Sequence, residues 1–195
     1  MRRTFLWLVM GSLMGSCQLV FSQSKYDSLP NQPEYYVQQV AKFKKEAPSK
    51  ARILFVGNSI TEGGNWRKLL KDSTIVNRGI SGDNTFGVLQ RLAEVSRHKP
   101  AKVFLLIGVN DLSKGIPNAV VIQNIFSIVT QIHSQSPKTA IYVHSILPVN
   151  PGHKSFPQKF SKQVDIMEIN GQLGKYGDAL KYTYVVSCAG SALGR

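Results

Sequence analysis

A serine stands directly after a short apolar run in the first third of the chain. Residues 53–56 are Ile-Leu-Phe-Val, and Gly57, Asn58 and Ser59 follow them. Such a run is typical of a buried parallel strand, and ligands bind outside the carboxyl ends of strands in an open α/β sheet. Gly57 permits a tight turn, which would lift the Ser59 hydroxyl into a crevice as a nucleophile. Taken alone, Ser59 is explained equally well as the N-cap of a helix.

Two later segments repeat this order of an apolar strand followed by glycine and polar residues. Residues 77–85 (Asn-Arg-Gly-Ile-Ser-Gly-Asp-Asn-Thr) come after a second short apolar run. Residues 103–107 form a third apolar run, and residues 108–111 (Gly-Val-Asn-Asp) follow it. Because the carboxyl ends of parallel strands share one edge of a sheet, we expect the three polar segments to lie together.

These three segments resemble blocks I, II and III of the SGNH (GDSL-type) esterases and acylhydrolases. The blocks correspond to residues 57–59, to Gly82 and to residues 108–111. The text of residues 77–87 and 110–117 is similar to the secreted carbohydrate-esterase and platelet-activating-factor-acetylhydrolase-like branch. The resemblance covers residues 50–186, and three blocks in the right order are a specific signature. It implies cleavage of short acyl esters, such as acetyl esters, on a small-molecule or glycan substrate, without a cofactor.

Ester cleavage needs a nucleophile and donors that stabilise the oxyanion, and the resemblance assigns both. Ser59 is the implied nucleophile. The implied oxyanion donors are the backbone N–H groups of Ser59 and Gly82 and the side-chain amide of Asn110. Asn58 replaces the Asp of the GDSL signature, and an Asn can still hydrogen-bond there to support the turn. The alternative for Asn110 is an ordinary turn or helix cap after the third strand.

Two further residues are expected near the substrate, and several other sites are excluded. Trp66 and Asn84 are predicted to line the acyl or sugar pocket, with packing of Trp66 on the sheet as the alternative. No Cys/His cluster has metal-ligand spacing, so no metal is expected. The chain also lacks a GxSxG nucleophile elbow, which argues against the α/β-hydrolase fold.

The resemblance fails at the C-terminus, where this family supplies its base from an Asp-x-x-His block before a closing helix. No Asp is followed by His three positions later anywhere in the chain, and the last histidine is His153. Residues 187–195 carry no helical apolar stripe, so we expect an atypical tail, truncated or altered by a reading-frame change, without the closing helix. His153 and His144 are the candidate substitutes. His98 and His133 are expected at the wrong end of the sheet.

The missing block leaves three hypotheses for the chain. It is an esterase by ancestry whose activity is impaired, a binding module that uses the same crevice without turnover, or a non-functional copy.

The N-terminal residues have the pattern of a targeting segment and are not expected to be part of the fold. Arg2 and Arg3 precede an apolar stretch at residues 5–21, and Ser22 before Gln23 fits a cleavage site. We therefore predict a signal peptide over residues 1–22 and a secreted or periplasmic protein. A lipoprotein anchored through Cys17 and an uncleaved anchor are the alternatives, although the stretch is short for a stable span.

The chain is basic, with a formal net charge of +13, which falls to +11 when Arg2 and Arg3 leave with the signal. This charge indicates either attraction to acidic partners such as anionic glycans or a lysine-rich surface that only keeps the protein in solution. No nucleic-acid-binding motif accompanies it.

Strand and helix patterns alternate along the rest of the chain. They predict a doubly wound parallel α/β sheet of about five strands, in a flavodoxin-like order by the resemblance. We divide the chain into the signal (1–22), an N-terminal helical segment (23–50), the esterase domain (51–186) and the tail (187–195). Helices are predicted at 31–46, 65–71, 85–98, 117–134 and 158–175, and strands at 52–56, 74–77, 102–107, 139–147 and 182–186.

Overall fold

A computed structural model of the chain describes residues 33–48, 53–148 and 162–187. Its centre is a five-stranded sheet in the order β2-β1-β3-β4-β5, in which every neighbouring pair is parallel. This is the flavodoxin-like order, and it confirms the predicted fold class. The strands are β1 (Ile53–Gly57), β2 (Ile75–Gly79), β3 (Lys102–Leu106), β4 (Ala140–His144) and β5 (Thr183–Val185).

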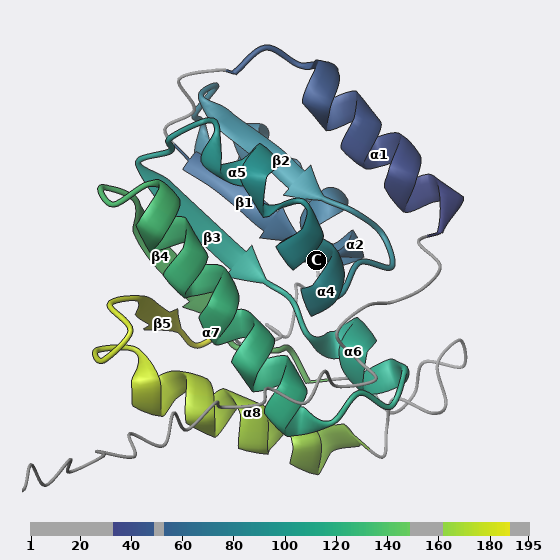
Figure 1. The fold of residues 1–195 in the computed structure, drawn as a ribbon, viewed down its shortest axis with the longest axis vertical. Helices are drawn as coiled ribbons and strands as arrows, with labels where there is room; N and C mark the ends of the chain where they lie inside the picture. Colours follow the sequence, from purple (N-terminus) through teal and green to yellow (C-terminus); the bar gives the residue numbers. More distant parts are fainter. Residues whose placement is uncertain (1–32, 49–52, 149–161, 188–195) are drawn as a thin grey trace, which may run out of the picture.

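The described helices surround this sheet. Figure 1 shows α4, α5 and α7 across the face turned to the viewer and α1 beside the β2 edge. None of them, within the described ranges, is long and apolar enough to cross a bilayer. They are α1 (Glu34–Lys45), α2 (Ser59–Glu62), α3 (Trp66–Leu70), α4 (Thr85–Gln90), α5 (Leu92–Ser96), α6 (Val109–Ser113), α7 (Asn118–Gln135) and α8 (Gln163–Tyr176).

The core lies between the sheet and α7, because alternate strand residues face that helix. The apolar stripe predicted for residues 117–134 is buried as expected. Its members are Val121, Ile125, Ile128 and Ile132, and the strand residues in the same cluster include Leu54, Val56, Val103, Leu105, Ile141 and Val143.

The opposite face of the sheet carries a row of stacked aromatic rings. Phe55 on β1, Phe104 on β3 and Tyr142 on β4 occupy matching register positions. Their ring centroids are 4.9 Å and 4.6 Å apart, and Trp66 of α3 continues the row beyond Phe55 at 4.4 Å. Helix α3 therefore packs on this second face.

The structure corrects two predicted elements and adds two short helices. The helix predicted at 85–98 is two helices that meet at Arg91, whose backbone leaves the helical region while its side chain turns into the interior. The strand predicted at 139–147 ends at His144, because the Asn170 side chain on α8 binds both the N–H and the C=O of Ile146. Helices α2 and α6 were not predicted, since four or five residues are too short to show helical periodicity.

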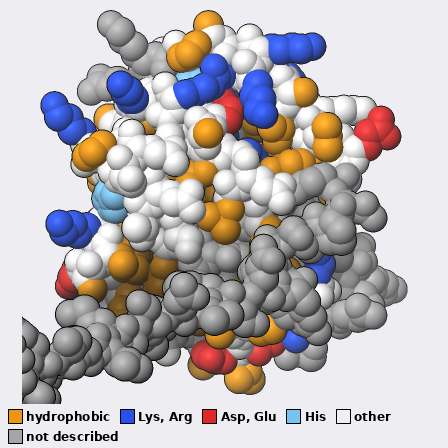
Figure 2. All heavy atoms as spheres, viewed as in Figure 1, with side chains coloured by type: hydrophobic (Ala, Val, Ile, Leu, Met, Phe, Trp, Pro, Cys, Tyr) orange, Lys and Arg blue, Asp and Glu red, His pale blue; other side chains and the backbone are white. Residues whose placement is uncertain are grey.

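Space-filling atoms show how charge is distributed on one side of the molecule. Figure 2 presents the face with α4, α5 and α7, where lysine and arginine side chains lie mainly toward the upper part of the view. Fewer acidic side chains are visible there.

Candidate active site

The three polar segments meet at one edge of the sheet. Gly57 at the end of β1 pairs in register with Gly79 of β2 and with Leu106 of β3. The Ile80 N–H then donates to the Gly57 carbonyl at 3.0 Å, which holds the segment after β2 against the end of β1. Ser59, Gly82 and Asn110 follow these strand ends within four residues, so the sheet brings all three to its carboxyl edge.

Ser59 is the first residue of α2, and its side chain is exposed. Asn58, which is buried, is the N-cap: its side chain accepts from the Ile60 N–H at 3.0 Å. The alternative in which Ser59 caps a helix is therefore wrong. Gly57 is needed in the turn, because a Cβ there would overlap the Leu106 carbonyl and the Thr61 hydroxyl. Ser59 thus presents both its hydroxyl and a first-turn N–H that has no acceptor within the helix.

Asn110 contacts the loop that contains Gly82, although 28 positions separate the two residues in the sequence. Gly82 has a φ of 79°, in the left-handed region that favours glycine. The Asn110 side-chain amide donates to the backbone carbonyl of Asp83, the next residue, at 2.8 Å. A primary amide has two N–H donors, and this bond uses one. The other donor and the Gly82 N–H are the donors that an oxyanion at this edge would need.

A layer of buried polar side chains, formed by Asp83 with Arg91 and by Thr85 with Asp111, holds these segments in place. Sequence analysis did not predict it. Arg91 is fully buried and pairs with the Asp83 carboxylate at 2.9 Å, while the same guanidinium donates to the Gly57 carbonyl at 3.4 Å. Burial raises the pKa of Asp83, and the charge of Arg91 opposes that shift. Arg91 thereby links the turn before Ser59 to the loop that contains Gly82. The signal that could have found it is the position of Arg91 directly before the apolar Leu92 in the predicted helix.

Asp111 forms the second part of this layer. Its carboxylate accepts from the Thr85 N–H at 3.1 Å and from the Thr85 hydroxyl at 2.6 Å. Asn124 of α7 donates to the same hydroxyl at 2.9 Å. Burial raises the pKa of Asp111 to about 6. The residue that follows Asn110 therefore ties α6 to the first turn of α4.

Asn84 and Trp66 have structural roles that the geometry explains. Asn84 is the buried N-cap of α4 and accepts from the Gly87 N–H at 3.0 Å. Trp66 stacks on Phe55 with an interplanar angle of 3°, and its indole N–H donates to the Thr61 carbonyl at 2.7 Å. These contacts agree with the alternative in which Trp66 packs on the sheet, and contact of either residue with a substrate stays a prediction.

His144 lies on β4, away from Ser59. One position before it, Val143 is in register with Leu105, which places His144 level with Leu106 and two strands from Gly57. Two strand spacings are about 10 Å. The His144 Nδ1 atom lies 2.7 Å from the Ser187 hydroxyl, and burial lowers the pKa of the imidazole.

The remaining histidines are at the other end of the sheet or outside the described residues. His98 is buried before β3 and lies 3.1 Å from the Glu94 carboxylate. His133 near the end of α7 lies 3.0 Å from the Lys181 carbonyl, just before β5. Both positions confirm the expectation that these residues are far from the strand carboxyl ends. His153, residues 188–195 of the tail and the predicted signal fall outside the described part of the chain.

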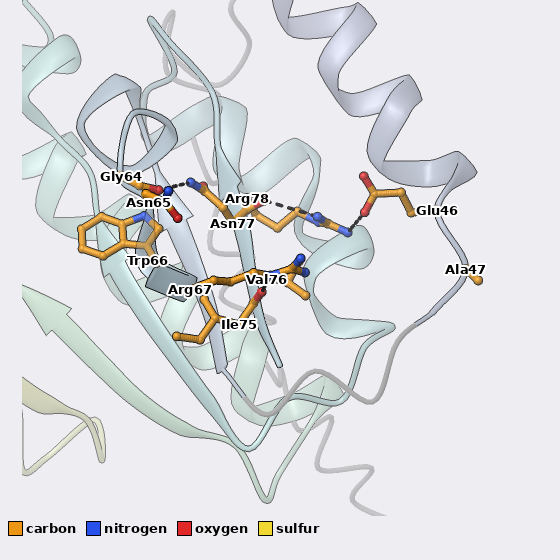
Figure 3. A pocket seen from close by; sticks show the side chains of 10 residues that line it. All are labelled: Glu46, Ala47, Gly64, Asn65, Trp66, Arg67, Ile75, Val76, Asn77 and Arg78. Carbon is orange, nitrogen blue, oxygen red and sulfur yellow. Dashed lines mark hydrogen bonds and ion pairs between the residues drawn. The ribbon is translucent and has the colours of Figure 1, made fainter. Parts of the chain in front are cut away.

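A pocket of about 410 Å³ opens beside the outer edge of β2, but neither Ser59, Gly82 nor Asn110 lines it. Figure 3 shows Arg78 reaching across it to Glu46 at the end of α1, at 2.7 Å. Arg67 on the opposite wall donates to the Ile75 carbonyl at 2.6 Å. The three charged side chains that line this pocket, Glu46, Arg67 and Arg78, thus have partners within the protein. Across the described residues, no group of three His, Cys, Asp or Glu side chains could hold a metal.

The sequence is similar to a known protein family and to characterised relatives. Residues 55–187 match the GDSL-like lipase/acylhydrolase family. An arylesterase of Vibrio mimicus is 28% identical over an alignment of 118 residues, and the match covers 53% of this chain and 58% of the relative. Human platelet-activating factor acetylhydrolase IB subunit alpha2 is 29% identical over 124 residues, 60% of this chain and 53% of the relative. The chain thus spans little more than half the length of these curated relatives.

The three-dimensional comparison agrees with this match. The crystal structure of a GDSL-like lipase from Bacteroides thetaiotaomicron superposes with a TM-score of 0.62 and 25% identity, covering 77% of each chain.

Proposed function

Because the chain belongs to the GDSL-like lipase/acylhydrolase (SGNH) family, we propose that it is a serine esterase for short acyl esters, such as acetyl esters on carbohydrates. One observation carries the proposal most directly: the Asn110 amide lies beside the Gly82 loop, at the sheet edge where Ser59 is exposed. A nucleophilic hydroxyl and converging neutral donors are what acyl transfer requires.

In the proposed reaction, the Ser59 hydroxyl attacks the ester carbonyl and an acyl-enzyme forms as the alcohol leaves. The negative charge that develops on the carbonyl oxygen is stabilised by the N–H groups of Ser59 and Gly82 and by the Asn110 amide. Neutral donors suit this role because they stabilise charge only in the transition state and add none to the resting site. Water then attacks the acyl-enzyme, which releases the carboxylic acid and restores Ser59.

We further propose that this turnover is impaired, because a serine at its free pKa is a weak nucleophile without an adjacent base, and the described histidines lie two strands from Gly57 or at the other end of the sheet. In the described part of the chain, His144, His98 and His133 have the partners Ser187, Glu94 and Lys181. A positioned general base typically contributes about 10²- to 10⁴-fold. An Asp-x-x-His segment fused after Val186 should therefore raise the hydrolysis rate by about that factor.

The decisive test is hydrolysis of p-nitrophenyl acetate and of an acetylated xylo-oligosaccharide by the native chain, Ser59→Ala and Asn110→Ala. We expect slow hydrolysis by the native chain that disappears in Ser59→Ala. Ser134→Ala, which removes an exposed hydroxyl from α7, is the matched control and should leave the rate unchanged. Equal rates for the native chain and Ser59→Ala would refute the esterase proposal. Saturable sugar-ester binding without hydrolysis would support the binding-module alternative.

A further inference from the structure

Glu62 connects the helix that begins with Ser59 to the loop that contains Gly82. It is the last residue of α2, one helical turn beyond Ser59. Its Oε2 atom accepts from the Ser81 N–H at 2.8 Å and also from the Ser81 hydroxyl. Ser81 directly precedes Gly82, so a single carboxylate joins the segment of the nucleophile to the segment of an oxyanion donor.

The other oxygen of the same carboxylate binds the N-terminal helix. The Tyr35 hydroxyl on α1 donates to Glu62 Oε1 at 2.5 Å, and this hydrogen bond raises the pKa of Tyr35. Both oxygens of Glu62 thus have donors, and hydrogen bonds to an ionised carboxylate are stronger than those between neutral groups. Tyr35 lies 20 positions before the residues that match the family, so the contact extends the site beyond the matched region.

The backbone around Glu62 is also fixed. The Asn77 side chain on β2 donates to the carbonyls of Thr61, at 2.8 Å, and of Glu62, at 3.1 Å. Gly79 at the end of β2 permits this close approach, because a Cβ there would overlap the Glu62 backbone nitrogen. Because its backbone is held against β2, the Glu62 carboxylate can fix the position of the Ser81 N–H to which it is bonded.

We propose that Glu62 is a positioning residue of the esterase site, which sets the Gly82 loop against Ser59 through its bonds to Ser81 and Tyr35. The proposal rests on the esterase function proposed above. Glu62 acts through Ser81, so its loss would displace an oxyanion donor without removing it. A displacement of about 1 Å in such a site can cost about 100-fold in rate.

The test measures kcat and KM for p-nitrophenyl acetate together with amide hydrogen exchange at Ser81 and Gly82. Glu62→Ala should lower the Ser59-dependent kcat by up to about 100-fold with little change in KM, and should speed exchange at both amides. Glu62→Gln keeps an oxygen that can accept from the Ser81 N–H, so it should recover most of the rate. Tyr35→Phe removes one bond only and should have a smaller effect.

Glu34→Ala is the matched control, because it also removes a carboxylate. Glu34 is the first residue of α1, and its carboxylate accepts from the Gln38 side chain. This variant should change neither rate nor exchange. Unchanged exchange in Glu62→Ala would show that Glu62 does not hold the loop. Faster exchange with an unchanged kcat would overturn the positioning role. If native and Ser59→Ala rates are equal, the esterase function fails instead, and exchange alone then decides whether Glu62 holds the loop.

Discussion

The side-chain amide of Asn110 donates to the backbone carbonyl of Asp83 at 2.8 Å. This bond joins the segment after β3 to the segment after β2, at the sheet edge where Ser59 begins α2. The orientation of the amide is therefore set before any substrate binds. Preorganised donors of this kind cost no reorganisation when charge develops, which makes Asn110 the most direct test of the proposed chemistry.

Replacing Asn110 by Ala should lower the Ser59-dependent kcat on p-nitrophenyl acetate by about 10²- to 10³-fold, the usual loss for one oxyanion donor. Asn118→Ala is the control, because Asn118 at the start of α7 donates from its amide to Asp165 and Glu168 on α8. Steady-state kinetics decide the outcome. A drop confined to KM would place Asn110 in substrate binding rather than in stabilisation of the transition state.

The stability of the chain should depend on the ionisation of Asp111. Its folded-state pKa is about 6, raised from 3.8 by burial. A raised pKa means that the folded state binds the proton more tightly than the unfolded state. The contribution of Asp111 to the free energy of unfolding is therefore complete below about pH 4 and is lost as the pH rises through 6. Between pH 4 and pH 7, the native chain should lose about 2–3 kcal/mol relative to Asp111→Asn. Urea unfolding at several pH values measures this difference, and a constant difference would contradict the prediction.

Arg91 should be needed chiefly for the folding of the site. Arg91→Met leaves the buried Asp83 carboxylate without its partner, and breaking a buried pair typically costs about 3–5 kcal/mol. Arg91→Met combined with Asp83→Asn should cost less, because the second change removes the unpaired charge. Lys68→Met, at an exposed position of α3, serves as the control in denaturant unfolding. A double variant no more stable than Arg91→Met would mean that packing, not charge, dominates.

The export of the protein stays a prediction from sequence. We expect a mature chain that begins near Gln23, because the charged, apolar and small-residue regions of residues 1–22 have the order of a signal peptide. Intact mass spectrometry of the exported protein measures this start, and Leu8→Arg in the apolar region should block export. Cys17→Ala should change nothing, whereas a lipid on Cys17 would favour the lipoprotein alternative. A cytoplasmic species that retains Met1 would contradict the prediction.

Local patterns were sufficient for the parallel α/β class and most of its elements, whereas the strand order was predicted only from the family resemblance. The strand at Ile53–Gly57 and the core stripe of α7 follow from apolar runs and 3.6-residue periodicity, because burial of those faces drives the fold. The order of the polar segments after three strands was also enough to predict that they share one edge. These features depend on residues close together in the sequence, so a single sequence contains them.

The contacts that shape the site depend instead on residues far apart in the chain. Arg91 interrupts a predicted helix because its guanidinium is paired with Asp83 in the interior. Glu62 binds Tyr35 and Ser81, which are 27 and 19 positions away. The sequence by itself thus determined the fold class and the residues that could do chemistry. Only the tertiary structure decided which buried and polar groups hold them, because hydrogen bonds and ion pairs require distances that the folded backbone alone sets.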